Sequence, residues 1–148
     1  MIDITVNKKG MINLRKVSKK LIPVVFDEME DTGIRIRNHM IRAMDRTPRS
    51  GKLYRAGGKV DRRSLPGKAP APDTSRLKNS LKVNVRKTAL EVEVGSNLKP
   101  QGGAKKAYSE YLEEGTTHMK ARPFLEPAIA SATKNMGRRI ERAIKRIK

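Results

Sequence analysis

The chain has 148 residues, of which 36% are hydrophobic and only 3% aromatic, and its formal net charge is +19. This length predicts a single domain, residues 1–148, with a thin core that copies of the chain or other proteins complete. The absence of cysteine excludes disulfides and thiolate metal sites.

The positive charge is concentrated in two segments. Residues 47–79 carry nine Lys/Arg against two Asp/Glu, and residues 121–148 carry eight against two. Such density predicts a salt-sensitive attraction to a polyanion, either nucleic acid or an acidic protein surface. No apolar run near residue 1 has the length of a signal peptide, and none approaches that of a membrane span. We therefore expect a soluble, intracellular protein.

The first third of the chain changes from a strand pattern to a helical one. Alternating apolar and polar residues over 2–6 predict a short N-terminal strand, followed by a turn at 7–10. From about Asn13 to Arg46 apolar residues recur at steps of three and four, which predicts helix. Pro23 predicts a break between a short helix and a longer one. The methionines of this pattern are expected in the core, and the acidic residues at 27–31 on a solvated face, paired with bases one turn away.

Residues 47–73 are rich in proline and glycine and show no secondary-structure pattern, which predicts an extended basic loop or arm. One alternative is a solvated insertion; the other is an arm that orders against DNA or a neighbouring subunit. The candidate contact residues are Arg49, Lys52, Tyr54, Arg55, Lys59, Arg62, Arg63 and Lys68. A short helical turn over 74–79, capped by Asp73 or Thr74, follows the arm.

Two alternating runs, 81–86 and 89–95, predict a β-hairpin with one apolar face. Its outer face places Lys/Arg opposite Glu. After Pro127 an apolar stripe predicts one long helix to the C-terminus, with more cations than the helix dipole requires. The predicted fold is therefore α+β: this hairpin and the N-terminal strand form a small antiparallel sheet, packed against a long N-terminal and a long C-terminal helix, with a long basic loop.

A sharp junction between two helices is predicted at residues 108–128. Tyr108, Tyr111 and Leu112 recur at helical spacing, so a short helix can present one apolar face. Gly115 stands where a helix C-terminus favours a residue at positive φ.

The second half of the junction is governed by two prolines. Pro123 disfavours helix at Arg122, so the chain from 116 to 122 is expected to be extended. Pro127 lacks an N–H and therefore belongs in the first turn of the next helix, with a separate turn at 123–126 that buries Phe124 and Leu125. Three glutamates flank Gly115 and are candidates for salt bridges to a basic loop of the next subunit: Glu110, Glu113 and Glu114.

These residues resemble the signature of the neck proteins of tailed bacteriophages, the head–tail joining or tail-completion components. The resemblance is carried by Tyr-x-x-Tyr-Leu-Glu-x-Gly-Thr at 108–116 and by Met-x-Ala-Arg-Pro-Phe-Leu-x-Pro-Ala at 119–128. Residues 63–81 are also similar to the family, although Thr74-Ser75 stands where the family commonly has Thr-Gly. With the N- and C-terminal helices, the resemblance covers most of the chain from about residue 14.

The resemblance implies a structural virion protein of a phage or prophage neck, assembled in the cytoplasm of the bacterial host. Copies would form a ring of six-fold or twelve-fold symmetry that joins the head connector to the tail and lets DNA pass. Its partners would be itself, head-connector and tail proteins and, transiently, double-stranded DNA in the lumen. Cations lining that lumen would retard DNA, so most of the charge is expected to face acidic neighbours. A membrane or small-molecule substrate is not expected.

Charge alone supports an alternative equally well, a basic protein that binds nucleic acid without sequence preference. The scarcity of aromatic residues argues against base stacking. No residue set predicts catalysis: His39 and His118 stand alone, and the glycine pairs at 57–58 and 102–103 lack the context of a phosphate-binding loop. We therefore expect a protein that is not an enzyme and has no catalytic, cofactor-binding or metal-binding residues.

Overall fold

The computed structural model describes residues 8–56, 58–71 and 75–146, with the backbone alone for 8–18, 54, 56, 59 and 61. The predicted strand at 2–6 lies outside these residues. The elements in chain order are α1 (Lys8–Arg46), β1 (Leu53–Ala56), β2 (Lys59–Arg62), α2 (Arg76–Ser80), β3 (Leu81–Arg86), β4 (Glu91–Ser96), α3 (Tyr108–Glu114), α4 (Leu125–Thr133) and α5 (Met136–Lys145).

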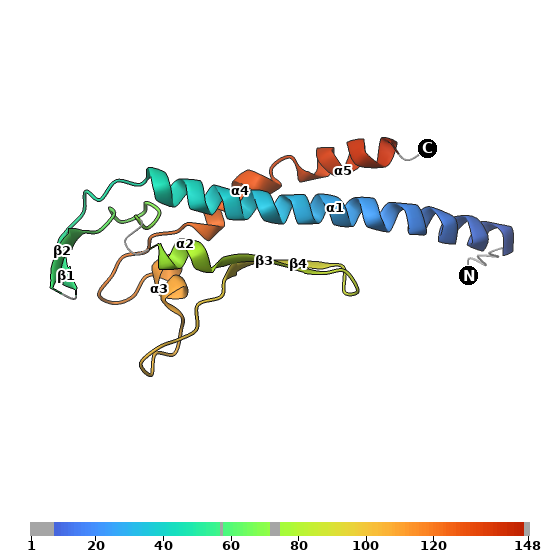
Figure 1. The fold of residues 1–148 in the computed structure, drawn as a ribbon. Helices are drawn as coiled ribbons and strands as arrows, with labels where there is room; N and C mark the ends of the chain where they lie inside the picture. Colours follow the sequence, from blue (N-terminus) through green and yellow to red (C-terminus); the bar gives the residue numbers. More distant parts are fainter. Residues whose placement is uncertain (1–7, 57, 72–74, 147–148) are drawn as a thin grey trace, which may run out of the picture.

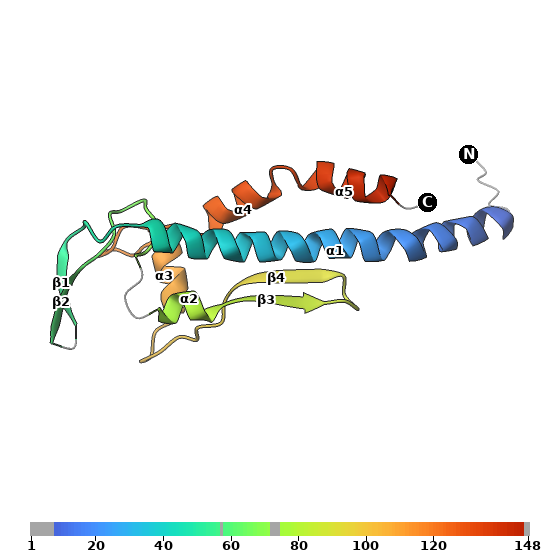
Figure 2. The same ribbon diagram turned by 45° about the horizontal axis from the view of Figure 1, so that its top comes forward.

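The fold is α+β, as predicted, and is arranged around α1. Figure 1 shows α4 and α5 along one side of this helix and the β3–β4 hairpin along the other. The view in Figure 2 shows the same three layers, with α2 and α3 at one end of the hairpin. The β1–β2 hairpin lies beyond the C-terminal end of α1, apart from these layers.

Helix α1 is continuous over 39 residues, so the predicted break at Pro23 is wrong. It also begins at Lys8, where a turn at 7–10 was predicted. A proline inside a helix removes one backbone hydrogen bond and costs about 3 kcal/mol. Packing against α4, α5 and both strands of the β3–β4 hairpin outweighs this cost, and Phe26, just beyond Pro23, is buried. Tertiary contacts have therefore overridden a strong local signal.

One core cluster joins the three layers. Its members are Ile36, Met40, Met44, Leu81, Leu112, Phe124, Ala128 and Ala132. Met40 and Met44 are fully enclosed, which confirms that methionines of α1 serve as core residues. The cluster draws on α1, β3, α3 and α4, so it lies where these elements converge.

The β3–β4 hairpin packs its valine face against α1 at Gly33. Val83 pairs with Val94 and Val85 with Val92 in antiparallel register. A Cβ built on Gly33 would lie 2.8 Å from Val92 Cγ1 and 3.1 Å from Val83 Cγ1, so the helix approaches the sheet closely only because residue 33 has no side chain.

The outer face of the hairpin carries the predicted pairing of opposite charges. The Arg86 guanidinium lies 3.3 Å from the Glu91 carboxylate and 3.1 Å from that of Glu93. The second strand begins at residue 91 and not at 89, because Leu90 has φ 51° and belongs to the turn. Short helix α2 is preceded by Ser75, also at positive φ (57°) and with no side-chain capping bond; the predicted caps lie outside the described residues.

The C-terminal segment forms two helices where one was predicted. Helix α4 ends at Thr133 and α5 begins at Met136. Asn135 has φ −117° and ψ 15°, outside the helical region, and asparagine is a poor helix former. The break lets the two helices take separate paths along α1 (Figure 2). Among the described residues, no helix combines the length and apolarity needed to cross a membrane.

Candidate functional site

The basic segment predicted to be an unstructured loop contains a β-hairpin. Strands β1 and β2 are antiparallel, with Leu53 opposite Arg62 and Arg55 opposite Val60. The prediction of no secondary structure is therefore wrong for Leu53–Ala56 and Lys59–Arg62. The signal was present in the sequence, because two consecutive glycines between two short runs are typical of sequences that form a two-residue hairpin turn.

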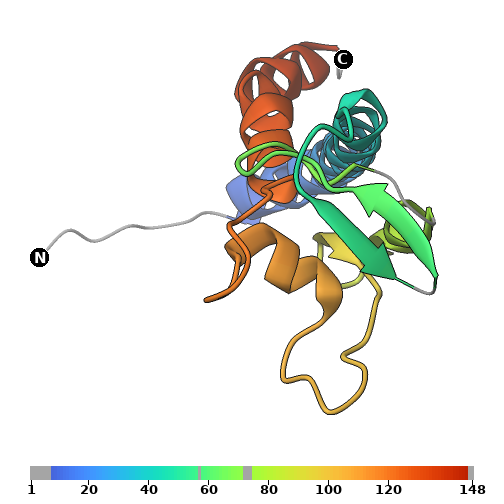
Figure 3. The ribbon, with the colours of Figure 1, turned by 90° about the vertical axis from the view of Figure 1, so that its left-hand side faces the viewer.

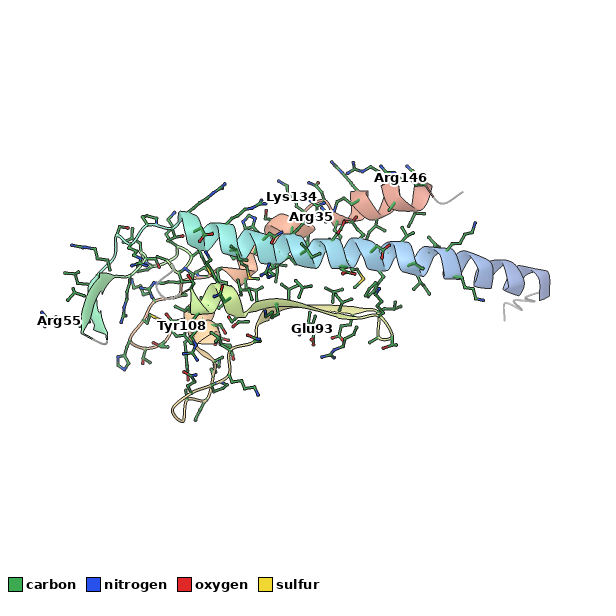
Figure 4. The ribbon with its side chains drawn as sticks, viewed as in Figure 1. Arg35, Arg55, Glu93, Tyr108, Lys134 and Arg146 are labelled. Carbon is green, nitrogen blue, oxygen red and sulfur yellow. The ribbon has the colours of Figure 1, made fainter. Side chains whose placement is uncertain are left out.

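One face of this β1–β2 hairpin mixes apolar and cationic side chains in solvent. Residues directly opposite each other project to the same side of a sheet, so Leu53, Arg55, Val60 and Arg62 share a face. Leu53 is 59% exposed and Val60 58% exposed. Figure 3 shows the hairpin beside the end of α1, with its strands outside the helical layers, and Figure 4 shows Arg55 at its outer end.

The base of the hairpin is fixed by backbone hydrogen bonds. Gly51 N donates to Arg63 O at 2.6 Å, and Arg63 N donates to Lys52 O at 3.2 Å, which extends the ladder by one step. A Cβ on Gly51 would lie 2.6 Å from Arg63 O and 2.7 Å from Ser64 O. Only glycine fits this close backbone approach.

The structure brings the hairpin base and the predicted junction together. The buried side chain of Arg122 donates from Nε to Ser64 O at 3.3 Å, and Gly67 N donates to Ala121 O at 2.9 Å. Arg122 N also donates to Leu112 O at 2.7 Å, which ties the same residue to α3. Arg122 thus links three segments that are distant in the sequence.

The turn at Gly115 follows the prediction. Gly115 has φ 80° and follows the last residue of α3, and its N–H donates to Tyr111 O at 2.9 Å. A Cβ here would lie 2.8 Å from Ala121 N, so the returning chain at residue 121 also requires glycine. Leu112 is buried, whereas Tyr108 is 59% exposed at the start of α3 and therefore adds little to the core. Three positions after it, Tyr111 is half-buried.

The carboxylate of Glu113 caps the N-terminus of α4, a role that the sequence did not predict. Glu113 accepts three backbone N–H groups, from Phe124 (2.9 Å), Leu125 (3.0 Å) and Glu126 (3.0 Å). These are donors that a helix N-terminus leaves without an internal partner, and the negative charge also suits the helix dipole. The cap lies more than ten residues upstream of α4, so local capping rules could not find it.

The other two glutamates also have partners within the chain, and salt bridges from the three glutamates to a basic loop of another subunit stay a prediction. Glu110 accepts the N–H of Ala107 at 3.1 Å at the start of α3. Glu114 accepts a hydrogen bond from Lys106, and this contact raises the pKa of the Lys106 ammonium. The acidic cluster therefore stabilises the junction itself.

The prolines of the junction behave partly as predicted. Phe124 is buried, at 4% exposure, and immediately precedes α4. Helix α4 begins at Leu125, so Pro127 lies in its first turn, where its missing N–H costs nothing. The predicted separate turn over 123–126 is wrong in extent, because two of its residues already belong to the helix. Pro123 is half-buried before it.

The remaining predicted contact residues of the basic segment are exposed: Arg49, Lys52, Arg55, Arg62, Arg63 and Lys68. The side chains of Tyr54 and Lys59 lie outside the described residues. Within the part of the chain that the structure describes, no group of three or more His, Asp or Glu residues could hold a metal ion. The candidate site is therefore an exposed β-hairpin that projects from the surface and is held at its base by hydrogen bonds.

Comparison of the chain with protein-family models, with curated proteins and with solved structures gave no match.

Proposed function

We propose that the protein is a structural component of the neck of a tailed phage or prophage, where copies form a ring that joins the head connector to the tail. The motif at 108–128, which resembles that of neck proteins, supports this proposal. Its distinctive residues have interlocking roles here: Gly115 makes the close turn, Arg122 joins three segments and Phe124 enters the core.

The observation that carries the proposal is the β1–β2 hairpin. A two-stranded hairpin is marginally stable alone, and this one exposes Leu53 and Val60 to solvent. Contact with a neighbouring subunit would bury these side chains, and Arg55 on the same face suits an acidic surface. The rigid base at Arg63–Gly67 fixes the direction in which the hairpin projects.

The proposal assigns a role to each part. The junction holds α3 and α4 together as the body of the protomer, and the β1–β2 hairpin is the arm that reaches the adjacent subunit or the adjacent ring. The high net charge, +19, opposes the close approach of free protomers and favours assembly on acidic partners.

The test is assembly with and without the apolar face of the arm. The double variant Leu53→Asp/Val60→Asp should remain folded, because both residues are exposed, and should fail to form rings or to enter neck complexes in electron micrographs and by native mass spectrometry. Leu90→Asp is the matched control, since Leu90 is 45% exposed at the far turn of the β3–β4 hairpin. Aspartate also tolerates its positive φ well.

Two outcomes would count against the proposal. One is a double variant that assembles as the unmodified chain does. The other is an unmodified protein that stays a monomer when mixed with head-connector and tail proteins.

A second candidate function, sequence-independent nucleic-acid binding, is favoured by the net charge of +19. DNA affinity alone does not separate the two functions, because a neck ring would also surround DNA. Assembly separates the two functions. A protein that binds DNA with a steep salt dependence but never joins a particle has the second function.

A further inference from the structure

An open groove lies between α1 and the α4–α5 segment, on the side of α1 away from the β3–β4 hairpin. Its volume is about 360 Å³. Its lining is polar and cationic, with one small apolar residue: Arg35, Asn38, His39, Arg42, Ser131, Ala132 and Arg139. We call this feature the cationic groove.

One wall of the cationic groove is held by Arg139. Its guanidinium bonds to the Glu28 carboxylate, and its Nη2 donates to Thr32 Oγ1 at 2.9 Å and to Ala132 O at 3.1 Å. The expectation that Glu28 pairs with a base one turn away on α1 is therefore wrong, because its partner comes from α5. The charge of Arg139 is neutralised by Glu28, and its side chain is held in place by these three partners. Arg139 therefore forms part of the groove wall, and other cations would bind a ligand.

Arg35 and Arg42 are those cations. Both are exposed, and within the described part of the chain neither guanidinium makes an ion pair or a hydrogen bond. They lie seven residues apart on α1, or roughly 10 Å along the helix axis. That distance equals about three nucleotides of axial rise along one strand of B-DNA.

We propose that the cationic groove binds the phosphate backbone of double-stranded DNA. Each guanidinium presents a planar fork of donors that matches the oxygens of a phosphate. Asn38 and His39 add donors between the two arginines on α1, Ser131 adds one from α4, and no carboxylate is among the described lining residues.

The helical segment on the opposite wall extends the positive charge. Exposed Lys134, Arg138 and Arg142 follow Ser131 on the same segment. In Figure 4, Lys134, which directly follows α4, and Arg35 of α1 are labelled at about the same position along α1. A row of cations of this kind suits a polymer whose negative charges repeat at a fixed interval.

The lining favours a DNA backbone over an acidic protein surface. Protein interfaces are anchored by aromatic and other large apolar side chains, and the groove offers only Ala132, which is buried. It also favours a duplex over a single strand, because single strands are held by stacking mainly on Phe, Tyr and Trp, and none of these is among the lining residues. Binding should therefore be independent of base sequence.

This inference does not rest on ring assembly, and it concerns residues other than those of the arm. The protein used to test it is the full chain, with a fluorescent DNA duplex of mixed sequence as the probe. Anisotropy titrations over a series of KCl concentrations give the affinity and its dependence on salt.

The informative variant is Arg35→Ala/Arg42→Ala. Loss of two phosphate contacts should reduce the slope of log affinity against log salt by about 2, and weaken binding by about tenfold at moderate salt. The matched control, Lys87→Ala/Lys105→Ala, removes the same charge from exposed loops elsewhere. It should leave most of the affinity in place. Ser131→Glu, which adds a carboxylate to the groove at an exposed position, should weaken binding as the arginine variant does.

Three results would overturn the inference. The first is an equal loss in the groove variant and the control, which would mean that net charge alone attracts DNA. The second is a polyglutamate peptide that competes better than the duplex and responds to the same variants, which would assign the groove to an acidic protein. The third is a single strand that binds more tightly than the duplex.

Discussion

Gly33 offers a direct test of the packing between α1 and the β3–β4 hairpin, through the variant Gly33→Ala. Two effects of opposite sign act on this variant. Alanine is a better helix former than glycine by about 1 kcal/mol, so helix propensity alone predicts a more stable protein. The new methyl group, however, would lie 2.8 Å from Val92 Cγ1 and 3.3 Å from Val94 Cγ2.

The steric effect should win. Valine is restricted at χ1, so Val92 cannot turn away freely, and α1 must move off the sheet. Overpacking of this kind costs about 1–3 kcal/mol. Subtracting the gain in propensity leaves a net loss of about 1 kcal/mol, or a fall in Tm of about 2–4 °C for a chain of this size.

Gly137→Ala is the matched control. Gly137 lies in α5, and beyond its chain neighbours and the adjacent helix backbone no described atom lies within 4 Å of the position its Cβ would take. There the propensity gain acts alone, so Tm should rise by about 2–4 °C. Thermal unfolding followed by circular dichroism measures both variants under one set of conditions. If Gly33→Ala stabilises the protein as much as Gly137→Ala does, the close approach of helix and sheet described above is incorrect.

Two further substitutions test the junction and the arm. Glu113→Ala removes the acceptor of three N–H groups at the start of α4 and should lower the free energy of unfolding, measured in urea, by about 2–3 kcal/mol. Substitution of the exposed Glu114 by alanine should lower that free energy by less than about 1 kcal/mol. Equal losses for the two variants would contradict the capping role of Glu113. Gly51→Ala would force a methyl group against Arg63 O and should open the base of the arm, seen as faster tryptic cleavage within 52–63, whereas Gly95→Ala, with open space around it, should leave the cleavage rate unchanged.

Local patterns in the sequence were sufficient for much of the fold. The alternation of valines predicted the β3–β4 hairpin because a strand exposes its two faces in turn, and the spacing of Met40 and Met44 predicted a buried stripe on α1. Gly115 was identified because few other residues adopt a positive φ after a helix. Each of these features depends on residues within a few positions of one another.

Several errors arose where distant residues decide the outcome. The loss at Pro23 is outweighed by packing against elements more than 50 residues away, which no local rule contains. The intrachain partners of Glu28 and Glu113 come from α5 and from the start of α4, and local spacing could predict neither. The cationic groove exists only because α4 and α5 lie against α1.

The sequence by itself therefore determined the class of fold, the glycine turn and the surplus of positive charge, since these follow from composition and short-range periodicity. Tertiary structure alone decided which charges are neutralised within the chain and which remain available. It did so because an ion pair depends on distance in space, and α1 brings together residues that are more than a hundred positions apart, as Glu28 and Arg139 are.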